Sequence, residues 1–245
     1  MTDKVWKHPS FRLTALQMLA LGFALMILLG ALLLMLPIAS RDHRSLPFLS
    51  ALFTSASATC VTGLVVCDTY TQFTFFGQAI LLLLIQIGGL GFMTVAVLWA
   101  MILGRRIGLL ERSYLVEAIS AMQLGGVVRL VKRVLIGTAI IEGAGALLLM
   151  IRFCPLLGLG EGVWYGVFHS VSAFCNAGFD LMGRFDAFSS LTMFALDPLV
   201  CLTIAALILI GGIGFFVWND IAANRWHFRK YRLHTKLMLV STLVL

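Results

Sequence analysis

The chain has 245 residues, of which 60% are hydrophobic and only 12% are charged, and its mean hydropathy is +1.01. Soluble globular chains carry roughly 25% charged residues, so this composition excludes a soluble domain and indicates an integral membrane protein. The net charge of +7 does not indicate nucleic-acid binding, because the basic residues gather beside apolar segments, as in chains that cross a lipid bilayer.

Three apolar segments without a charged residue cover residues 13–36, 73–103 and 198–218, which are 24, 31 and 21 residues long. A helix of about 20 apolar residues crosses a bilayer core about 30 Å thick, so each segment is predicted to be a span, as are residues 134–151. The first segment is too long for the core of a cleavable signal peptide and no cleavage motif follows it. We expect it to be retained.

Two shorter apolar segments, residues 47–59 and 163–174, lie between these spans. Helices of this length rise only about 20 Å, which is too little to cross the bilayer. A short helix that enters the membrane and turns back is a re-entrant half-helix, tolerated where protein or water surrounds its end. The first is expected to begin with a cap from the Ser45 hydroxyl, followed by Pro47.

The sequence around the half-helices is repeated. Residues 51–64 align with residues 166–179 at an offset of 115, with six of 14 positions identical, and residues 87–92 match residues 210–215 at an offset of 123. The repeat predicts an all-α membrane protein built from span, pore loop and span. Its expected parts are a cytoplasmic N terminus (1–12), a first repeat (13–103), a connection (104–133), a second repeat (134–218), a second connection (219–236) and the start of a third repeat (237–245).

Residues 237–245 are too few to span a membrane, so we expect the chain to be part of a longer polypeptide, truncated within its third repeat. Within the first connection, residues 111–122 are predicted to form an amphipathic helix. Fourteen of the 18 Lys and Arg residues lie in the N terminus and the two connections. Basic segments stay in the cytoplasm, which predicts a multi-pass protein with its N terminus inside.

Each half-helix is followed by a glycine-containing loop, Cys-Val-Thr-Gly at residues 60–63 and Cys-Asn-Ala-Gly at residues 175–178. The C terminus of a helix carries partial negative charge, and extended residues after it can offer carbonyl oxygens in place of a cation's hydration shell. No charged side chain lies in residues 54–66 or 170–179, which argues against a carboxylate filter for Ca²⁺. The alternative is two ordinary connecting loops, but the repeated glycine favours a pore.

These motifs, together with Gln86-Ile-Gly-Gly-Leu-Gly-Phe-Met-Thr94 and Leu233-His-Thr-Lys236, resemble the Trk/Ktr/HKT family of potassium transporters, most closely the membrane subunit of bacterial Ktr systems. The resemblance implies four span–pore-loop–span repeats around one pore with pseudo-fourfold symmetry. It also implies a homodimer in the bacterial cytoplasmic membrane, on a cytosolic ring of nucleotide-binding regulatory subunits.

The resemblance further implies which residues form the selectivity filter. Glycine at the filter position is associated in this family with potassium preference, and serine with sodium permeation. The filter residues carried over to this chain are Cys60, Val61, Thr62, Gly63, Cys175, Asn176, Ala177 and Gly178. The expected function is K⁺ uptake through these carbonyls, with Na⁺ dependence left open and no resident cofactor, metal or enzymatic activity.

Three alternatives stay open at this point. One is a non-selective or sodium-permeable pore on the same scaffold, and another is a non-conducting truncated subunit. The third is a membrane enzyme with His169 and Ser170 as base and nucleophile, although no orienting carboxylate is placed beside them by the sequence. The five cysteines form no C-x-x-C pair and suggest neither a disulfide framework nor a zinc site.

Several other residues carry expectations. Glu142 is the one acid inside a predicted span and needs a partner; we expect a structural hydrogen bond rather than a role in conduction. The Gly-Gly-x-Gly motifs at 88–91 and 211–214 are expected to allow close helix packing. Hydroxyls are expected to hold the half-helices against their neighbours (Ser55, Ser57, Ser170 and Ser172). Asp68 and Asp180 are expected to be exposed loop acids that either gather cations or are merely solvated.

Overall fold

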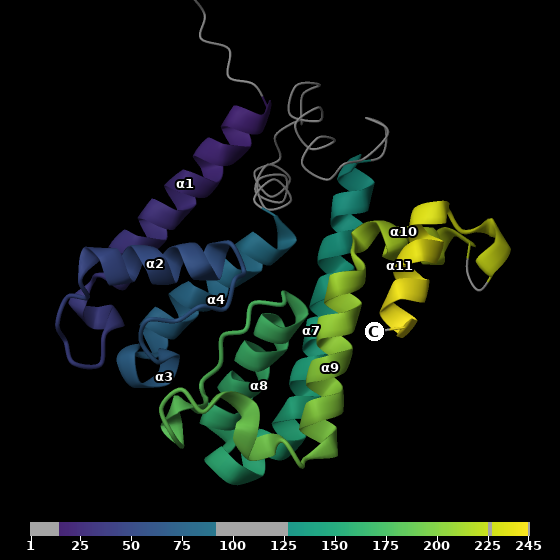
Figure 1. The fold of residues 1–245 in the computed structure, drawn as a ribbon. Helices are drawn as coiled ribbons and strands as arrows, with labels where there is room; N and C mark the ends of the chain where they lie inside the picture. The colour runs from purple at the N-terminus through teal and green to yellow at the C-terminus, as the bar shows by residue number, and fades with distance from the viewer. Residues whose placement is uncertain (1–14, 92–126, 225–226, 245) are drawn as a thin grey trace, which may run out of the picture.

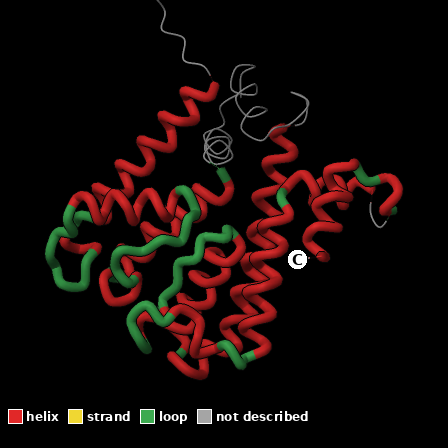
Figure 2. Tube along the Cα trace, in the orientation of Figure 1, coloured by secondary structure: helices red, strands yellow, loops and turns green. Residues whose placement is uncertain are grey.

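A computed structural model of the protein describes residues 15–91, 127–224 and 227–244, and every regular element in these ranges is helical (Figure 2). The expected helical class is therefore confirmed for this part of the chain, whereas the amphipathic helix expected at residues 111–122 lies outside it. The α-helices are α1 (Ala15–Leu34), α2 (Phe48–Thr59), α3 (Thr69–Gln72), α4 (Phe75–Leu90), α7 (Val127–Leu157), α8 (Leu159–Phe174), α9 (Pro198–Ile213), α10 (Phe215–Asn224) and α11 (Leu233–Val244).

Six of the described helices form two groups of three. Helices α1, α2 and α4 pack on one another, and α7, α8 and α9 do the same (Figure 1). In each group the middle helix in chain order, α2 or α8, overlaps a predicted half-helix and is followed by an extended loop (Figure 2). Four short 3₁₀ helices lie in the connecting segments: η1 (Pro37–Ala39), η2 (Met182–Arg184), η3 (Ser190–Phe194) and η4 (Phe228–Lys230).

Among the described helices, α7 is the one that is long and apolar enough to cross a bilayer unaided, over Val131–Leu157. The pair Pro198–Ile213 and Phe215–Ala222 also passes this test when both are taken as one span, although they are bent by 86°. Helices α1 and α4 contribute shorter apolar stretches, Leu19–Leu34 and Phe75–Leu90. A long apolar helix, together with two shorter ones, fits a chain that lies in a membrane.

A glycine follows the end of α4 and the end of α9, the return helices of the two groups, at equivalent positions. Helix α4 ends at Leu90 and α9 ends at Ile213, and the following residues, Gly91 and Gly214, have φ of +82° and +87°. An L-residue adopts such a φ only with strain, whereas glycine does so freely. The span predicted over residues 198–218 is therefore not one straight helix, because α9 and α10 meet at Gly214 with a bend of 86°. Residues 92–103 of the other predicted span lie outside the described part.

Several helices begin at residues other than the predicted ones. The N-cap of α2 is Pro47, with ψ of 136° and no side-chain cap hydrogen bond, so the predicted cap by Ser45 is wrong. Proline fixes φ and disfavours helical conformation in the residue before it, which places the start of the helix after Pro47. Helix α8 begins at Leu159 instead of residue 163, and α7 at Val127 instead of residue 134.

A buried core extends across both groups of helices. Its largest fully buried side chains include Phe73 and Leu81 from the first group and Phe153 and Phe168 from the second. Between the groups, the Trp164 indole Nε1–H on α8 donates to Gln78 Oε1 on α4 at 2.8 Å. Its ring also lies 4.4 Å, centroid to centroid, from that of Phe75. These contacts position α8 against α4, and with it the loop that follows α8.

The glycines of the return helices provide a graded test. Gly214→Ala adds a Cβ in open space but at positive φ, so we expect it to lower the free energy of unfolding by about 1–2 kcal/mol. Gly211→Ala would overlap the Phe174 carbonyl oxygen and is expected to cost more, about 3 kcal/mol. Gly143→Ala lies in open space within α7 and should not lower the free energy of unfolding, since alanine is the better helix former by about 0.5–1 kcal/mol. Denaturant unfolding in detergent measures all three, and equal losses would contradict this order.

Candidate functional site

The two half-helices end in the same turn. In the first, Val61 N–H donates to Ala58 O at 3.4 Å and Thr62 N–H to Ser57 O at 3.0 Å. In the second, Asn176 N–H donates to Ala173 O at 3.0 Å and Ala177 N–H to Ser172 O at 2.8 Å. This pair of hydrogen bonds is the Schellman motif, which satisfies carbonyls that the helix leaves without partners.

The residue in the left-handed conformation of this turn is not a glycine in either copy. Val61 has φ of +57° and Asn176 has φ of +59°. Asparagine tolerates this region, but for a β-branched residue it is an outlier. Backbone strain of this kind persists where the surrounding structure imposes it and is common at functional sites. Sequence reasoning missed both residues in this respect; Asn176 carried a weak signal and Val61 carried none.

The glycines that follow the turns bring the two loops together. Gly63 and Gly178 have φ of +74° and +72°. A Cβ on Gly63 would lie 2.8 Å from Ala177 O and 3.3 Å from Gly178 Cα. Both glycines are thus needed for the backbone conformation and for the close approach of one loop to the other. The predicted filter residues of the two repeats therefore lie side by side.

The carbonyl oxygens of these loops are free of protein donors within the described ranges. The hydrogen bonds of the turns use carbonyls that precede Cys60 and Cys175, and no described donor bonds the carbonyl oxygens of residues 60–63 or 175–178. An unpaired carbonyl in apolar surroundings is unfavourable unless water or a cation takes the place of a donor. This arrangement can bind a cation without any charged side chain.

Serine hydroxyls fix the half-helices, but not all in the expected way. Ser55 Oγ donates to Ile27 O on α1 and Ser170 Oγ to Glu142 O on α7, each at 2.7 Å, which confirms the expected contact with neighbouring helices for these two. Ser57 and Ser172 instead bond to their own loops. Ser57 Oγ lies 2.8 Å from Thr62 Oγ1, and Ser172 Oγ donates to Phe179 O at 2.6 Å.

The return helices lie directly behind the ends of the half-helices. A Cβ on Gly88 would overlap the Thr59 carbonyl oxygen, and one on Gly211 would overlap that of Phe174. Close packing therefore explains the first glycine of each Gly-Gly-x-Gly motif, as expected. It does not explain the last one, Gly91 or Gly214, which follows the end of the helix and has open space around it.

Glu142 has the structural partner that its position required. Gln86 Nε2 on α4 donates to both carboxylate oxygens of Glu142 on α7, at 3.0 and 3.2 Å. The contact joins the two groups of helices. Gln86 lies two residues before Gly88, so the pair holds α4 where it backs the first half-helix. The sequence indicated that Glu142 needs a partner but did not identify Gln86.

His169 and Ser170 do not form a base and nucleophile pair. His169 Nδ1 bonds Tyr165 O at 2.8 Å, and its Nε2 lies 3.2 Å from the donating Leu181 N–H. The ring is therefore neutral, with the proton on Nδ1 and Nε2 as acceptor. Ser170 is occupied with Glu142 O. Both residues hold α8 in place, so the geometry does not support the hydrolytic alternative.

The two acids after the loops are not exposed, which corrects the expectation for both. The Asp68 side chain is buried and accepts three backbone N–H groups. Asp180 is half-buried, and its Oδ1 accepts from Met182 N–H at 2.8 Å. Burial raises the pKa of the Asp180 carboxyl, and the hydrogen bond from Met182 opposes this rise. Neither acid is simply solvated.

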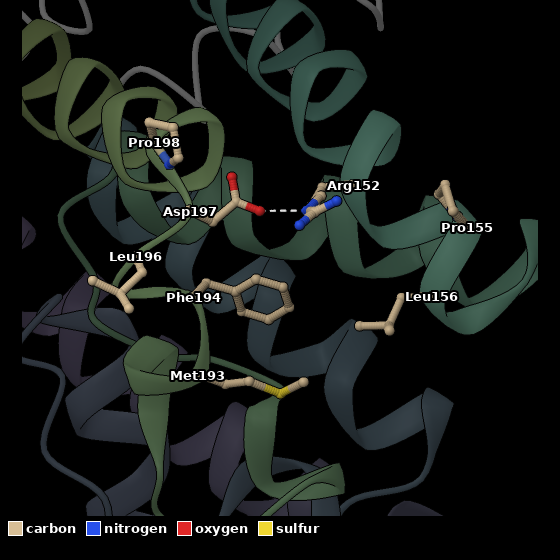
Figure 3. A pocket seen from close by; sticks show the side chains of 8 residues that line it. All are labelled: Arg152, Pro155, Leu156, Met193, Phe194, Leu196, Asp197 and Pro198. Carbon is tan, nitrogen blue, oxygen red and sulfur yellow. Dashed lines mark hydrogen bonds and ion pairs between the residues drawn. The ribbon is translucent and has the colours of Figure 1, made fainter.

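A cavity of about 220 Å³ is lined by Gly178, Asn176 and Asp180, among others, and opens beside the second loop. Another, of about 480 Å³, has no filter residue in its lining and lies where the C-terminal part of α7 meets η3 and the start of α9 (Figure 3). There the Arg152 guanidinium forms an ion pair with Asp197 above Phe194 and Met193. Within the described ranges no group of His, Cys, Asp and Glu side chains could hold a metal ion, and all five cysteines are free thiols.

The chain is similar to known cation transport proteins. Residues 5–243 match the family model TrkH, described as cation transport protein. The chain is 50% identical to Ktr system potassium uptake protein B of Bacillus subtilis (strain 168), over 99% of this chain and 52% of that protein. It is 40% identical to potassium/sodium uptake protein NtpJ of Enterococcus hirae (98% and 52%) and 38% identical to Ktr system potassium uptake protein B of Vibrio alginolyticus (92% and 48%). It thus spans about half the length of the curated relatives it matches.

An exchange of residues between the two turns tests the strain at Val61. Val61→Asn introduces the residue that the second repeat uses, and we expect it to raise the free energy of unfolding by about 1 kcal/mol, because Asn tolerates the left-handed region. Asn176→Val should lower it by a similar amount. Val66→Asn, at an exposed loop valine without positive φ, controls for the polarity change. Denaturant unfolding gives all three values; a loss of stability in Val61→Asn would refute the strain argument.

Proposed function

Because the chain belongs to the TrkH family of cation transport proteins, we propose that it forms part of the ion pathway of a potassium uptake protein. Ions would dehydrate at the carbonyl oxygens of residues 60–63 and 175–178 and pass down their electrochemical gradient. The observation that carries this proposal is the meeting of two half-helix ends at Gly63 and Gly178, with carbonyls that no described donor occupies.

The chemistry of these ligands favours a monovalent cation. Carbonyl oxygens are neutral, and a site without a carboxylate binds an ion weakly enough for it to leave again. The resemblance to the Trk/Ktr/HKT family associates glycine at the filter position with K⁺ preference, and both available positions, Gly63 and Gly178, are glycine. The site residues are proposed to act through their backbone, so Cys60, Thr62, Cys175 and Ala177 contribute carbonyls and not thiol, hydroxyl or methyl groups.

A potassium and sodium pathway is the second candidate. It is favoured by the 40% identical relative from Enterococcus hirae, whose name includes both ions. The two candidates share a scaffold and differ in the ratio of K⁺ to Na⁺ flux. An enzyme is not proposed, since the family consists of transporters and His169 and Ser170 are engaged in structural hydrogen bonds.

The surroundings of the pathway are also part of the proposal. The chain would cross the bacterial cytoplasmic membrane several times with its N terminus inside, which the distribution of Lys and Arg supports. The pore would be completed by further repeats of the same kind. A homodimer on a cytosolic ring of nucleotide-binding subunits is the assembly that the resemblance implies, and the word "system" in the names of two relatives fits a protein with partners.

Rubidium uptake tests the proposed function. Bacteria deficient in potassium uptake should express this chain, alone and fused to the remaining part of the Bacillus subtilis relative. We expect Rb⁺ uptake above the empty-vector rate in at least the fused form, and its loss in Gly63→Asp, since that side chain would lie at positive φ against Ala177 O. Gly143→Ala is the matched control, because its Cβ meets open space. Correctly inserted protein without uptake in either form would contradict the proposal.

Glu142→Gln separates structure from conduction. The substituted amide oxygen can still accept from Gln86 Nε2, so the contact between α4 and α7 is kept while the charge is removed. We expect an unchanged ratio of K⁺ to Na⁺ uptake. Glu142→Leu removes the contact and should lower the amount of folded protein in the membrane. A changed ion ratio in Glu142→Gln would show that the carboxylate takes part in ion selection.

A further inference from the structure

The segments that follow the two filter glycines, residues 64–67 and 179–182, are held in different ways. We call each the outer arm of its loop. In the second repeat, residues 179–182 are tied to α8 by three side chains: Ser172 Oγ donates to Phe179 O, His169 Nε2 accepts from Leu181 N–H, and Tyr165 O–H donates to Leu181 O at 2.9 Å. In the first repeat, Ser50 and Thr54 occupy the positions that correspond to Tyr165 and His169 at the offset of 115. Thr54 Oγ1 donates to Ser50 O, as His169 Nδ1 does to Tyr165 O, but Thr54 has no counterpart of the bond from Leu181 N–H to His169 Nε2 among the described residues.

The first loop therefore lacks the anchors of the second. Leu64, Val65 and Val66 are 60%, 38% and 50% exposed. Apart from a contact of the Cys67 thiol with Thr54, no side-chain hydrogen bond among the described residues joins residues 64–67 to α2. Residues 64–67 therefore depend on contacts other than side-chain hydrogen bonds to α2.

Asp68, the next residue, connects the outer arm of the first loop to the second repeat. Its Oδ1 accepts from Tyr70 N–H at 3.0 Å and from Thr71 N–H at 2.8 Å, which caps α3. Its Oδ2 accepts from Phe188 N–H at 3.0 Å, 120 residues away in the outer segment of the second repeat. Hydrogen bonds to a carboxylate are stronger than those between neutral groups.

Two features of the second repeat are shaped around this carboxylate. Phe188 has φ of +59° although its side chain is 62% exposed, so side-chain burial does not account for its strained backbone; the hydrogen bond to Asp68 does. On the other side, a Cβ on Gly183 would overlap both oxygens of Asp68. Glycine at 183 is what lets the carboxylate approach η2.

We propose that Asp68 is a positioning residue for the ion pathway: it clamps the outer arm of the first loop to the second repeat and so holds Gly63 opposite Gly178. Its relevance to ion selection rests on the proposed function, whereas the clamp itself does not. The asymmetry gives its physical reason. The second loop is fixed to its own half-helix by three side chains, whereas residues 64–67 have only the contact of Cys67 with Thr54 there. The segment after Asp68 is bonded to residues 38–41 of its own repeat, and Asp68 adds the bond to the second repeat. Small changes in carbonyl position alter which ion a filter prefers.

Three variants test the clamp. Asp68→Asn keeps an oxygen that can cap α3. It places an amide N–H₂ group opposite Phe188 N–H, and that group can only donate, so it cannot accept the Phe188 hydrogen bond. Gly183→Ala displaces the carboxylate from the opposite repeat and is independent of any change at Asp68. Asp186→Asn removes an exposed acid from the same outer segment and controls for loss of negative charge at the mouth.

Hydrogen exchange of the purified protein in lipid nanodiscs reads out the clamp without transport. We expect the Phe188 amide to exchange about tenfold faster in Asp68→Asn and in Gly183→Ala, the factor that corresponds to one charge-assisted hydrogen bond. Peptides that contain residues 60–68 should also exchange faster, and Asp186→Asn should match the wild-type protein. Unchanged exchange of residues 60–68 in both clamp variants would overturn the proposal.

The effect of the clamp on ion selection is measured as ion uptake, in the form of the protein that transports Rb⁺. The K⁺ to Na⁺ uptake ratio, corrected for the amount of protein in the membrane, should fall by roughly tenfold in both clamp variants and stay constant in Asp186→Asn. An unchanged ratio, or an equal fall in Asp186→Asn, would overturn the role in ion selection. If the exchange effects appear but the wild-type protein transports nothing, the clamp is supported and the proposed function fails.

Discussion

The structure depends on how a helix can end in apolar surroundings. The last carbonyl groups of an α-helix have no partner within the helix, and a membrane interior offers no water to supply one. At the ends of α2 and α8 a Schellman turn satisfies two of these carbonyls, and the return helix packs against another, that of Thr59 or Phe174. No donor in the described part of the chain bonds the oxygens of the next four residues. The proposed cation site would thus follow from the same constraint that stops the helix.

Two kinds of contact then turn separate half-helices into one site. Within each group, a serine on the half-helix donates to a carbonyl on the preceding helix, Ile27 for α2 and Glu142 for α8. Between the groups, Gln86 bonds Glu142 and Trp164 bonds Gln78. The first kind sets the angle of each half-helix, and the second sets the distance between the two loops. The half-buried side chains of Glu142 and Gln86 and the buried amide of Gln78 are tolerable because each has a partner.

Much of the backbone could be predicted from the sequence, because it follows from local patterns. Charge-free segments located helices, and the half-helix expected at residues 47–59 is observed as Phe48–Thr59. The break at Gly214 was missed because the flanking residues are uniformly apolar and hydropathy alone does not distinguish a bent span from a straight one. The left-handed Val61 contradicts its own conformational preference. Asp68 was taken for a loop acid because its partner, Phe188, is 120 residues away.

The two repeats differ in a way that separates ion binding from support. At the filter positions, Cys-Val-Thr and Cys-Asn-Ala have different side chains but the same turn, and both are followed by glycine at positive φ. A carbonyl ligand can come from any residue, so only the backbone conformation has to be the same in both loops. The side chains behind them are under no such requirement, and His169 and Tyr165 have Thr54 and Ser50 as counterparts. A repeated protein can therefore keep one ion chemistry while each repeat is anchored differently, and the less anchored loop is the one that depends on its neighbour.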